Sequence, residues 1–168
     1  MGAAFIDTAE SYGNVEVVGR AISGRRDRVF LATKVLPRHF RRHDVIHAAE
    51  QRLKRLNTDY IDLYQLHWPN YAVPIDETMA PMEELVEAGK VRFIGVSNFS
   101  ITDIEKAQAA LSKNRIVSNQ VRYSLVDRTI EDGLIQYCES KQITVLAFSP
   151  LGHGLQNIAS YDRQKRTR

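Results

Sequence analysis

The chain has 168 residues, of which 43% are hydrophobic and 26% charged, so it is long enough for one globular domain with a substantial core. The formal net charge of +3 is far from the dense basic surface that nucleic-acid binding requires, and we expect no nucleic-acid partner. No apolar run approaches the roughly 18 residues of a membrane span, Asp7 interrupts the N-terminal apolar run, and the one cysteine cannot form an internal disulfide. We therefore expect a cytoplasmic protein.

Short apolar runs alternate along the chain with amphipathic segments. The apolar runs are rich in β-branched and aromatic residues, and they predict strands at Ala3–Ile6, Val29–Thr33, Tyr60–Leu66, Val91–Gly95, Ile116–Gln120 and Ile143–Phe148. The segments between them predict helices at Val15–Ile22, Asp44–Leu56, Ile75–Ala88, Ile101–Leu111 and Thr129–Lys141. Asp44 and Ser100 are the expected N-caps, and Gly89 is the expected C-cap of the third helix.

Successive strands begin roughly 25 to 31 residues apart, which is the length of a repeated βα unit. Strands that are apolar throughout indicate a parallel sheet covered by helices, either an open doubly wound sheet or a (β/α)8 barrel. The chain contains no glycine-rich phosphate-binding motif, and polar residues collect at the ends of several strands, which favours the barrel. A complete barrel has eight strands, so the six found here predict a partial one. We assign residues 1–155 to this domain and expect the polar, basic residues 156–168 to be a disordered tail.

Four polar side chains are expected at the tips of the first three strands. Asp7 and Tyr12 follow the first strand, Lys34 ends the second and His67 ends the third. A lysine ammonium beside a tyrosine favours the phenolate and lowers the phenol pKa, and a carboxylate holds that lysine in place. A histidine beside the phenol can orient a substrate carbonyl. Tyr12 would then donate a proton while hydride arrives from a nicotinamide cofactor, since no side chain supplies hydride.

The sequence resembles the aldo-keto reductase family at six motifs that occur in the family's order and spacing. They are FIDTAESYGN (5–14), LATK (31–34), LHWP (66–69), GVSNF (95–99), SNQVRYS (118–124) and AFSPLG (147–152). Each motif is weak alone, but the six together cover nearly all of the chain. The resemblance implies a (β/α)8 barrel that binds NADPH across its C-terminal face and reduces a small-molecule aldehyde or ketone.

The resemblance also implies roles for individual residues. Tyr12 matches the family's proton donor, Asp7 and Lys34 its pKa-lowering pair, and His67 its carbonyl-orienting histidine. Residues at the later strand tips match cofactor contacts: Ser97, Asn98 and Gln120 for the nicotinamide carboxamide, Phe148 for stacking on the ring, and Ser149, Leu151 and Gly152 for the pyrophosphate. Trp68 matches a substrate-pocket aromatic. In the family the stacking aromatic is usually tyrosine or tryptophan, so Phe148 keeps the stack without the hydroxyl.

The chain departs from the family pattern at both ends. It corresponds to barrel strands two to seven and lacks the first and last βα units, including the segment that grips the adenosine 2′-phosphate. Two function classes follow from this: an NADPH-dependent reductase, or a non-catalytic fragment or partner subunit that cannot retain cofactor. Two apolar sheet edges, at Ala3–Ile6 and Ile143–Phe148, are expected to be unpaired and to promote self-association.

Three other features of the sequence have simpler interpretations. His43 and His47 have a metal-like i, i+4 spacing but no third ligand, so we expect a solvated helix start and no metal site. The carboxylate pair Asp59 and Asp62 could suggest a glycosidase, but both residues precede the C-terminal tip of their strand. Cys138 is expected to pack on the buried face of a helix rather than act as a nucleophile.

Overall fold

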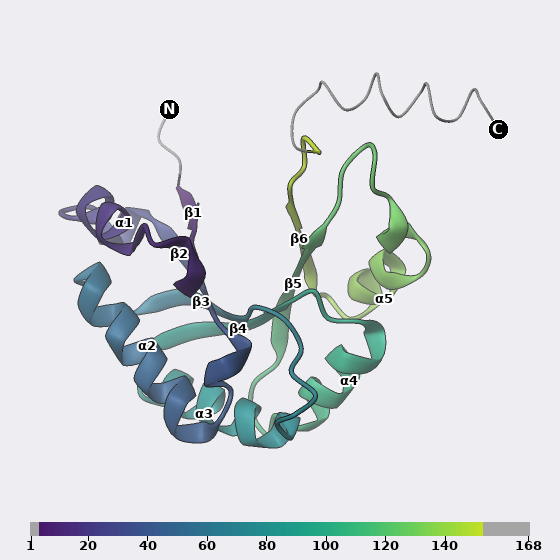
Figure 1. Ribbon diagram of the computed structural model, residues 1–168, viewed down its shortest axis with the longest axis horizontal. Helices are drawn as coiled ribbons and strands as arrows, with labels where there is room; N and C mark the ends of the chain where they lie inside the picture. Colours follow the sequence, from purple (N-terminus) through teal and green to yellow (C-terminus); the bar gives the residue numbers. More distant parts are fainter. Residues whose placement is uncertain (1–3, 153–168) are drawn as a thin grey trace.

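The computed structural model describes residues 4–152, which form a single parallel sheet with helices along one of its faces (Figure 1). The strands are β1 (Phe5–Asp7), β2 (Phe30–Val35), β3 (Ile61–Leu66), β4 (Val91–Ser97), β5 (Ile116–Arg122) and β6 (Thr144–Phe148). The α-helices are α1 (Val15–Ile22), α2 (Arg42–Leu56), α3 (Ile75–Glu87), α4 (Ile101–Ala109) and α5 (Leu134–Ser140). Short 3-10 turns are η1 (Glu10–Tyr12), η2 (Arg26–Arg28), η3 (Pro37–His39) and η4 (Thr129–Glu131). The predicted tail, 156–168, lies outside the described residues.

The six strands pair in the order in which they occur in the sequence, β1-β2-β3-β4-β5-β6, and every pair is parallel. A doubly wound sheet would reverse its strand order at a switch point, whereas a barrel adds each new strand on the same side of the previous one. The prediction of six parallel strands wound as part of a barrel is therefore confirmed, and the doubly wound alternative is wrong.

The sheet is strongly curled, with its helices on the outer face (Figure 1). The rings of Phe30 on β2 and Phe93 on β4 stack with centroids 6.2 Å apart, although β3 lies between these strands. Asp7 on β1 and Gln120 on β5 are four strand spacings apart, about 19 Å in a flat sheet, yet their side chains are joined by a hydrogen bond of 3.0 Å. Side chains from distant strands therefore converge on the inner face of the sheet.

The hydrophobic core lies between the outer face of the sheet and the helices. Its largest cluster combines β3 and β4 with α2, α3 and α4, and includes Tyr64, Phe40 and Met82 as fully buried side chains. A smaller cluster packs α1 against β2 and the end of α2. At that contact Gly19 lets the two helices approach closely, because a Cβ there would lie 2.9 Å from the carbonyl oxygen of Leu56.

The predicted helix ends agree with the structure at some positions and differ from it at others. Ser100 caps α4 with a complete capping box that includes Asp103, as predicted. The C-cap of α3 is Ala88 rather than the predicted Gly89, which is the next residue and has a φ of 69°. Asp44 is not the N-cap of α2, because that helix begins at Arg42 and Asp44 lies in its first turn. The helix predicted at 129–141 is split into η4 and α5, since Gly133 has a φ of 98° and interrupts the helical backbone.

The sheet edges are shorter than predicted at the N-terminal side. β1 and β6 are the outer strands of the six, as expected, but β1 contains only three residues within the described chain. The structure also contains, between residues 4 and 152, no helix that is both long and apolar enough to cross a membrane.

Asp62 on β3 forms the centre of a buried charge cluster at the N-terminal end of the strands. One carboxylate oxygen accepts hydrogen bonds from the guanidinium of Arg26 at 2.7 Å and from the backbone amide of Leu31 at 2.9 Å. The other accepts a hydrogen bond from Arg92 at 2.8 Å. The Asp62 side chain is only 2% exposed, so this carboxylate is fully used in holding β2, β3 and β4 together, and the glycosidase interpretation has no support here.

We predict that Asp62→Ala destabilises the fold by roughly 3 to 5 kcal/mol, because it leaves the partly buried Arg26 without its counter-ion and the Leu31 amide unpaired. Urea denaturation followed by circular dichroism measures this change. Asp59→Ala is the matched control, since Asp59 is exposed and should lose less than about 0.5 kcal/mol. Equal effects of the two substitutions would contradict a structural role for the cluster.

Candidate active site

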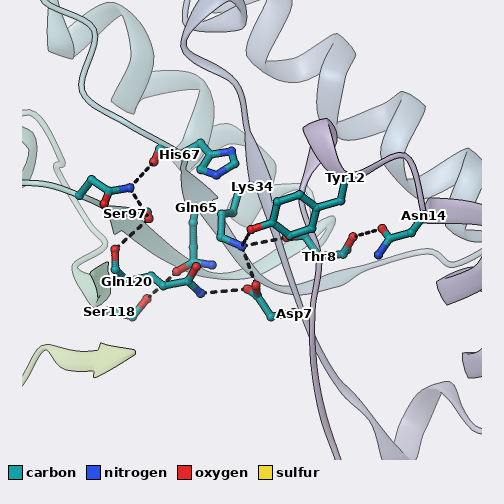
Figure 2. Close-up of polar contacts among 11 residues, drawn as sticks. Asp7, Thr8, Tyr12, Asn14, Lys34, Gln65, His67, Ser97, Ser118 and Gln120 are labelled. Atoms are coloured by element: carbon teal, nitrogen blue, oxygen red, sulfur yellow. Dashed lines mark hydrogen bonds and ion pairs between the residues drawn. The ribbon is translucent and has the colours of Figure 1, made fainter. Parts of the chain in front are cut away.

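Asp7, Tyr12 and Lys34 meet at the C-terminal end of β1 and β2, as the sequence predicted (Figure 2). The Nζ of Lys34 lies 2.6 Å from Oδ2 of Asp7 and 3.1 Å from the carbonyl oxygen of Thr8. Its third contact is the phenol oxygen of Tyr12 at 3.4 Å. The lysine is 1% exposed whereas Tyr12 is 50% exposed, so a buried cation faces the inner side of a phenol that solvent reaches from the other side.

His67 follows β3 and lies beside Tyr12, with the two rings edge to face at a centroid distance of 6.0 Å. The imidazole is 4% exposed and stacks on Trp68 at 3.8 Å. Burial lowers the pKa of His67, and the nearby charge of Lys34 lowers it further, to about 4. His67 is therefore neutral at pH 7. Within residues 4–152 its buried Nδ1 has no hydrogen-bond partner.

A chain of hydrogen bonds continues from His67 across β4 and β5 back to Asp7 (Figure 2). Nδ2 of Asn98 donates to the carbonyl oxygen of His67 at 3.1 Å and to Oγ of Ser97 at 3.0 Å. Ser97 in turn donates to the carbonyl oxygen of Gln120 at 2.8 Å, and Nε2 of Gln120 donates to Asp7 at 3.0 Å. The tips of β1, β3, β4 and β5 are thus joined in one polar network.

Asn98 has a backbone conformation that its site requires. Its φ is 60°, in the left-handed region where asparagine is among the few non-glycine residues found regularly. In this conformation its backbone amide donates to the carbonyl oxygen of Gln120 at 2.9 Å while its side chain reaches back to His67. A β-branched residue would be strained here.

The residues expected to contact a pyrophosphate are placed differently from the four catalytic candidates. Phe148 ends β6, where it pairs in register with Arg122, and the turn after it carries Ser149, Leu151 and Gly152. Ser149 has a φ of 50°, and Leu151 is 70% exposed. Among the described residues, no hydrogen bond joins Phe148, Ser149 or Leu151 to the four catalytic candidates.

The structure adds polar residues that the sequence analysis missed. Thr8 is fully buried, accepts from Lys34 through its carbonyl and donates through its hydroxyl to Asn14 at 2.6 Å. Gln65 is fully buried on the inner face of β3, where its Oε1 lies 3.5 Å from Oγ of Ser118. The signal for Gln65 was a polar residue inside the otherwise apolar end of a strand, whereas nothing in the sequence distinguished Thr8 from an ordinary turn residue.

Comparison with known proteins shows the family to which the chain belongs. A sequence profile described as the Aldo/keto reductase family matches residues 1–167. The chain belongs to the aldo/keto reductase family. It is 44% identical over 167 residues to the aldo-keto reductase YhdN of Bacillus subtilis strain 168, covering 92% of this chain and 50% of that protein. The chain thus spans about half the length of such a relative.

Solved structures of family members share the fold. A thermostable aldo-keto reductase, Tm1743, solved with the inhibitor epalrestat, is 41% identical with a TM-score of 0.88, covering 99% of this chain and 64% of that one. An aldo-keto reductase from Klebsiella pneumoniae, solved in complex with NADPH, is 43% identical with a TM-score of 0.84, covering 89% of this chain and 53% of that one. The chain is therefore a partial barrel of an oxidoreductase family whose members bind a nicotinamide cofactor.

Residues 4–152 contain no group of three or more His, Cys, Asp or Glu side chains arranged to hold a metal ion. The His43 and His47 rings stack on one another at 6.1 Å at the start of α2, where His43 is largely exposed.

The depressed pKa of His67 predicts a pH dependence of stability. The unfolded imidazole takes up a proton near pH 6.5, whereas the folded one resists protonation down to about pH 4. The contribution of His67 to the free energy of unfolding is therefore complete above pH 6.5. It decreases by at most about 3 kcal/mol as the pH drops from 6.5 to 4. Urea denaturation across this range should show the slope in the wild type and in His43→Gln, and a smaller slope in His67→Phe. An unchanged slope in His67→Phe would show that other groups cause it.

Proposed function

We propose that the chain carries the catalytic half-site of an NADPH-dependent carbonyl reductase, in which Tyr12 donates a proton to the carbonyl oxygen of an aldehyde or ketone. The observation that carries this proposal is the contact between the buried Lys34 ammonium and the exposed Tyr12 phenol, 3.4 Å apart, with Asp7 as the counter-ion of the lysine. A fixed positive charge beside a phenol oxygen stabilises the phenolate that remains after proton transfer. Exposure of the phenol on its other side leaves room for a substrate oxygen.

The neutral His67 imidazole suits an orienting role beside Tyr12. An imidazolium next to Lys34 would add a second buried positive charge, and burial disfavours it. A neutral ring can donate one N–H hydrogen bond to a carbonyl oxygen without competing with Tyr12 for its proton. Trp68, stacked on His67 and 44% exposed, provides an apolar wall beside that oxygen.

The polar groups at the tips of β4 and β5 fit a nicotinamide carboxamide. Oδ1 of Asn98 and Oε1 of Gln120 accept no hydrogen bond from residues 4–152, and they can accept from an amide NH2 group. The Ser97 hydroxyl adds a further polar group, and the Phe148 ring offers a surface for stacking. When bound, a nicotinamide cofactor supplies the hydride that no side chain can. We assign Ser149, Leu151 and Gly152 to its pyrophosphate, and the relative solved in complex with NADPH supports NADPH as the proposed cofactor.

The proposal predicts cofactor binding that the single tryptophan can report. Because Trp68 is the one tryptophan in the chain and stacks on His67, NADPH binding should quench its fluorescence in a saturable way. Tyr12→Phe should keep this binding and lower turnover of a generic aldehyde by about 100-fold or more. Tyr71→Phe, which removes a hydroxyl from an 84% exposed tyrosine, is the matched control and should retain wild-type turnover.

Two results would count against this function. If millimolar NADPH leaves the fluorescence of Trp68 unchanged, the second function class, a non-catalytic fragment or partner subunit, becomes the better description of this chain. If Tyr12→Phe keeps wild-type turnover, Tyr12 is not the proton donor.

We further propose that the chain self-associates through the open inner face and the edges of its sheet. We also propose that it resides in a reducing cytoplasm, which suits its free, buried Cys138. Phe5, Phe30 and Phe93 stack in a row across β1, β2 and β4, and Phe5 and Phe93 are 45% and 40% exposed. Exposed aromatic rows beside unpaired strand edges favour association.

Light scattering during size-exclusion chromatography should accordingly give a mass above the 19.1 kDa of one chain. Phe93→Lys should lower that mass by placing a charge in the aromatic row, and Leu125→Lys, at an 82% exposed position outside the row, should not. A sharp monomer peak for the wild type would contradict the proposal.

A further inference from the structure

Arg52 on α2 is a buried cation without a direct partner. The residue is 6% exposed, yet its guanidinium forms no hydrogen bond or ion pair with any residue between 4 and 152. Glu10 and Glu16 act on it only at longer range. An arginine stays protonated in proteins, and the Arg52 nitrogens are not among the enclosed, unpartnered polar atoms of residues 4–152, so its charged head is open to solvent while the rest of the side chain is buried.

Arg26 shows how this same protein satisfies a partly buried guanidinium. Its three nitrogens donate to the carbonyl oxygens of Val29 and Tyr60, to the hydroxyl of Thr58 and to the carboxylate of Asp62, all within 2.7 to 2.9 Å. Its ring partner is Tyr60, 3.8 Å below the guanidinium carbon. Arg52 has none of these contacts, so its donors remain available to a ligand.

Arg52 lines a cavity of about 310 Å³ that runs along α2 beneath η1 and η3, and we call this cavity the α2 groove. The other hydrogen-bond donors that line it are His39, His47 and Gln51, along with Arg55. Its volume lies at the lower end of the range for small-molecule sites and far above the roughly 30 Å³ that one water molecule occupies.

The two carboxylates of the α2 groove do not neutralise Arg52. Glu10 already accepts hydrogen bonds from the Leu36 amide and the Arg38 guanidinium, both at 3.0 Å, and lies 2.9 Å from Nδ1 of His39. Burial raises the pKa of Glu10, but these contacts outweigh burial and hold its pKa below the ordinary value. Asp44, at the start of α2, is paired only weakly with His43 at 3.8 Å and its side chain is 45% exposed. The charge left without a partner in the groove is therefore positive.

We propose that the α2 groove binds a small metabolite through an oxyanion group, phosphate or carboxylate, held by Arg52. The planar guanidinium fork matches two oxygens of either group. His47 and Gln51 can donate to the remaining oxygens or to hydroxyl groups of the ligand, whereas His39 is engaged with Glu10 and Arg38. This site is separate from the candidate active site, since α2 lies on the outer face of the sheet, and it shares only η1 with it through Glu10.

Equilibrium dialysis of the full chain with inorganic phosphate, and separately with acetate, at constant ionic strength in chloride, tests the site. We expect saturable binding of one equivalent of at least one anion, and the tighter of the two identifies the group. Arg52→Met should weaken that binding at least tenfold. Arg20→Gln, which removes an exposed guanidinium from α1, should leave it unchanged. No saturable binding of either anion, or equal binding by wild type and Arg52→Met, which would mean an adventitious ion only, overturns the proposal.

A stability measurement distinguishes a lost site from a damaged fold. Without added anion, Arg52→Met should unfold at the same temperature as the wild type or higher, since it removes a cation that has no counter-ion among residues 4–152 and keeps the apolar stem. Added phosphate or acetate, whichever binds, should raise the unfolding temperature of the wild type and not that of Arg52→Met. A lower unfolding temperature for Arg52→Met without anion would show that the protein itself satisfies Arg52, and the proposal would fail.

Discussion

The burial of the Lys34 ammonium constrains the N-terminal half of the site more than any other interaction. An ammonium that is 1% exposed is tolerated only where opposite charge and hydrogen-bond acceptors surround it, and here those are Asp7, the Thr8 carbonyl and the Tyr12 phenol. All three belong to β1 or to the turn after it. β1 contributes only three residues to the sheet, and the ion pair adds a side-chain link between this strand and β2. Both the position and the reactivity of the Tyr12 phenol therefore depend on Lys34.

Polar and charged side chains have their partners within the protein at one end of the strands, but several lack such partners at the other end. At the N-terminal end, Arg26 and Arg92 neutralise Asp62, and all three nitrogens of Arg26 donate hydrogen bonds inside the protein. At the C-terminal end, and along the outer helices, polar groups are left with unused capacity: the imidazole of His67, the amide oxygens of Asn98 and Gln120, and the guanidinium of Arg52. Since buried polar groups without partners are costly, they concentrate where a ligand can complete them. The contrast agrees with the general division of labour in parallel barrels, where the N-terminal face serves stability and the C-terminal face serves chemistry.

Much of the fold could be predicted from local patterns, because those patterns report burial. All six strands and all but one of the helices were found close to their predicted positions, and the order of the strand tips brought Asp7, Lys34 and His67 together. One error occurred at Gly133, where a single backbone angle determines whether the helix continues. Another occurred at Asp44, because an acidic residue is favourable both at an N-cap and in the first turn of a helix. Which polar groups would lack partners could not be predicted, since that depends on the distances that remain after packing. Arg52 looked like any other cation on an amphipathic helix until its neighbours were known.

The hydrogen bond between Gln120 and Asp7 has a consequence for the order in which the molecule assembles. It joins residues 113 positions apart, whereas the ion pair of Asp7 with Lys34 joins residues only 27 apart. Closing the longer loop costs roughly 1 kcal/mol more chain entropy, and contacts between such distant positions form slowly. The bond requires β2, β3 and β4 to be paired and the sheet to be curled before its two ends can meet. The hydrogen bond between Gln120 and Asp7 is therefore expected to form only after β1 to β5 have paired.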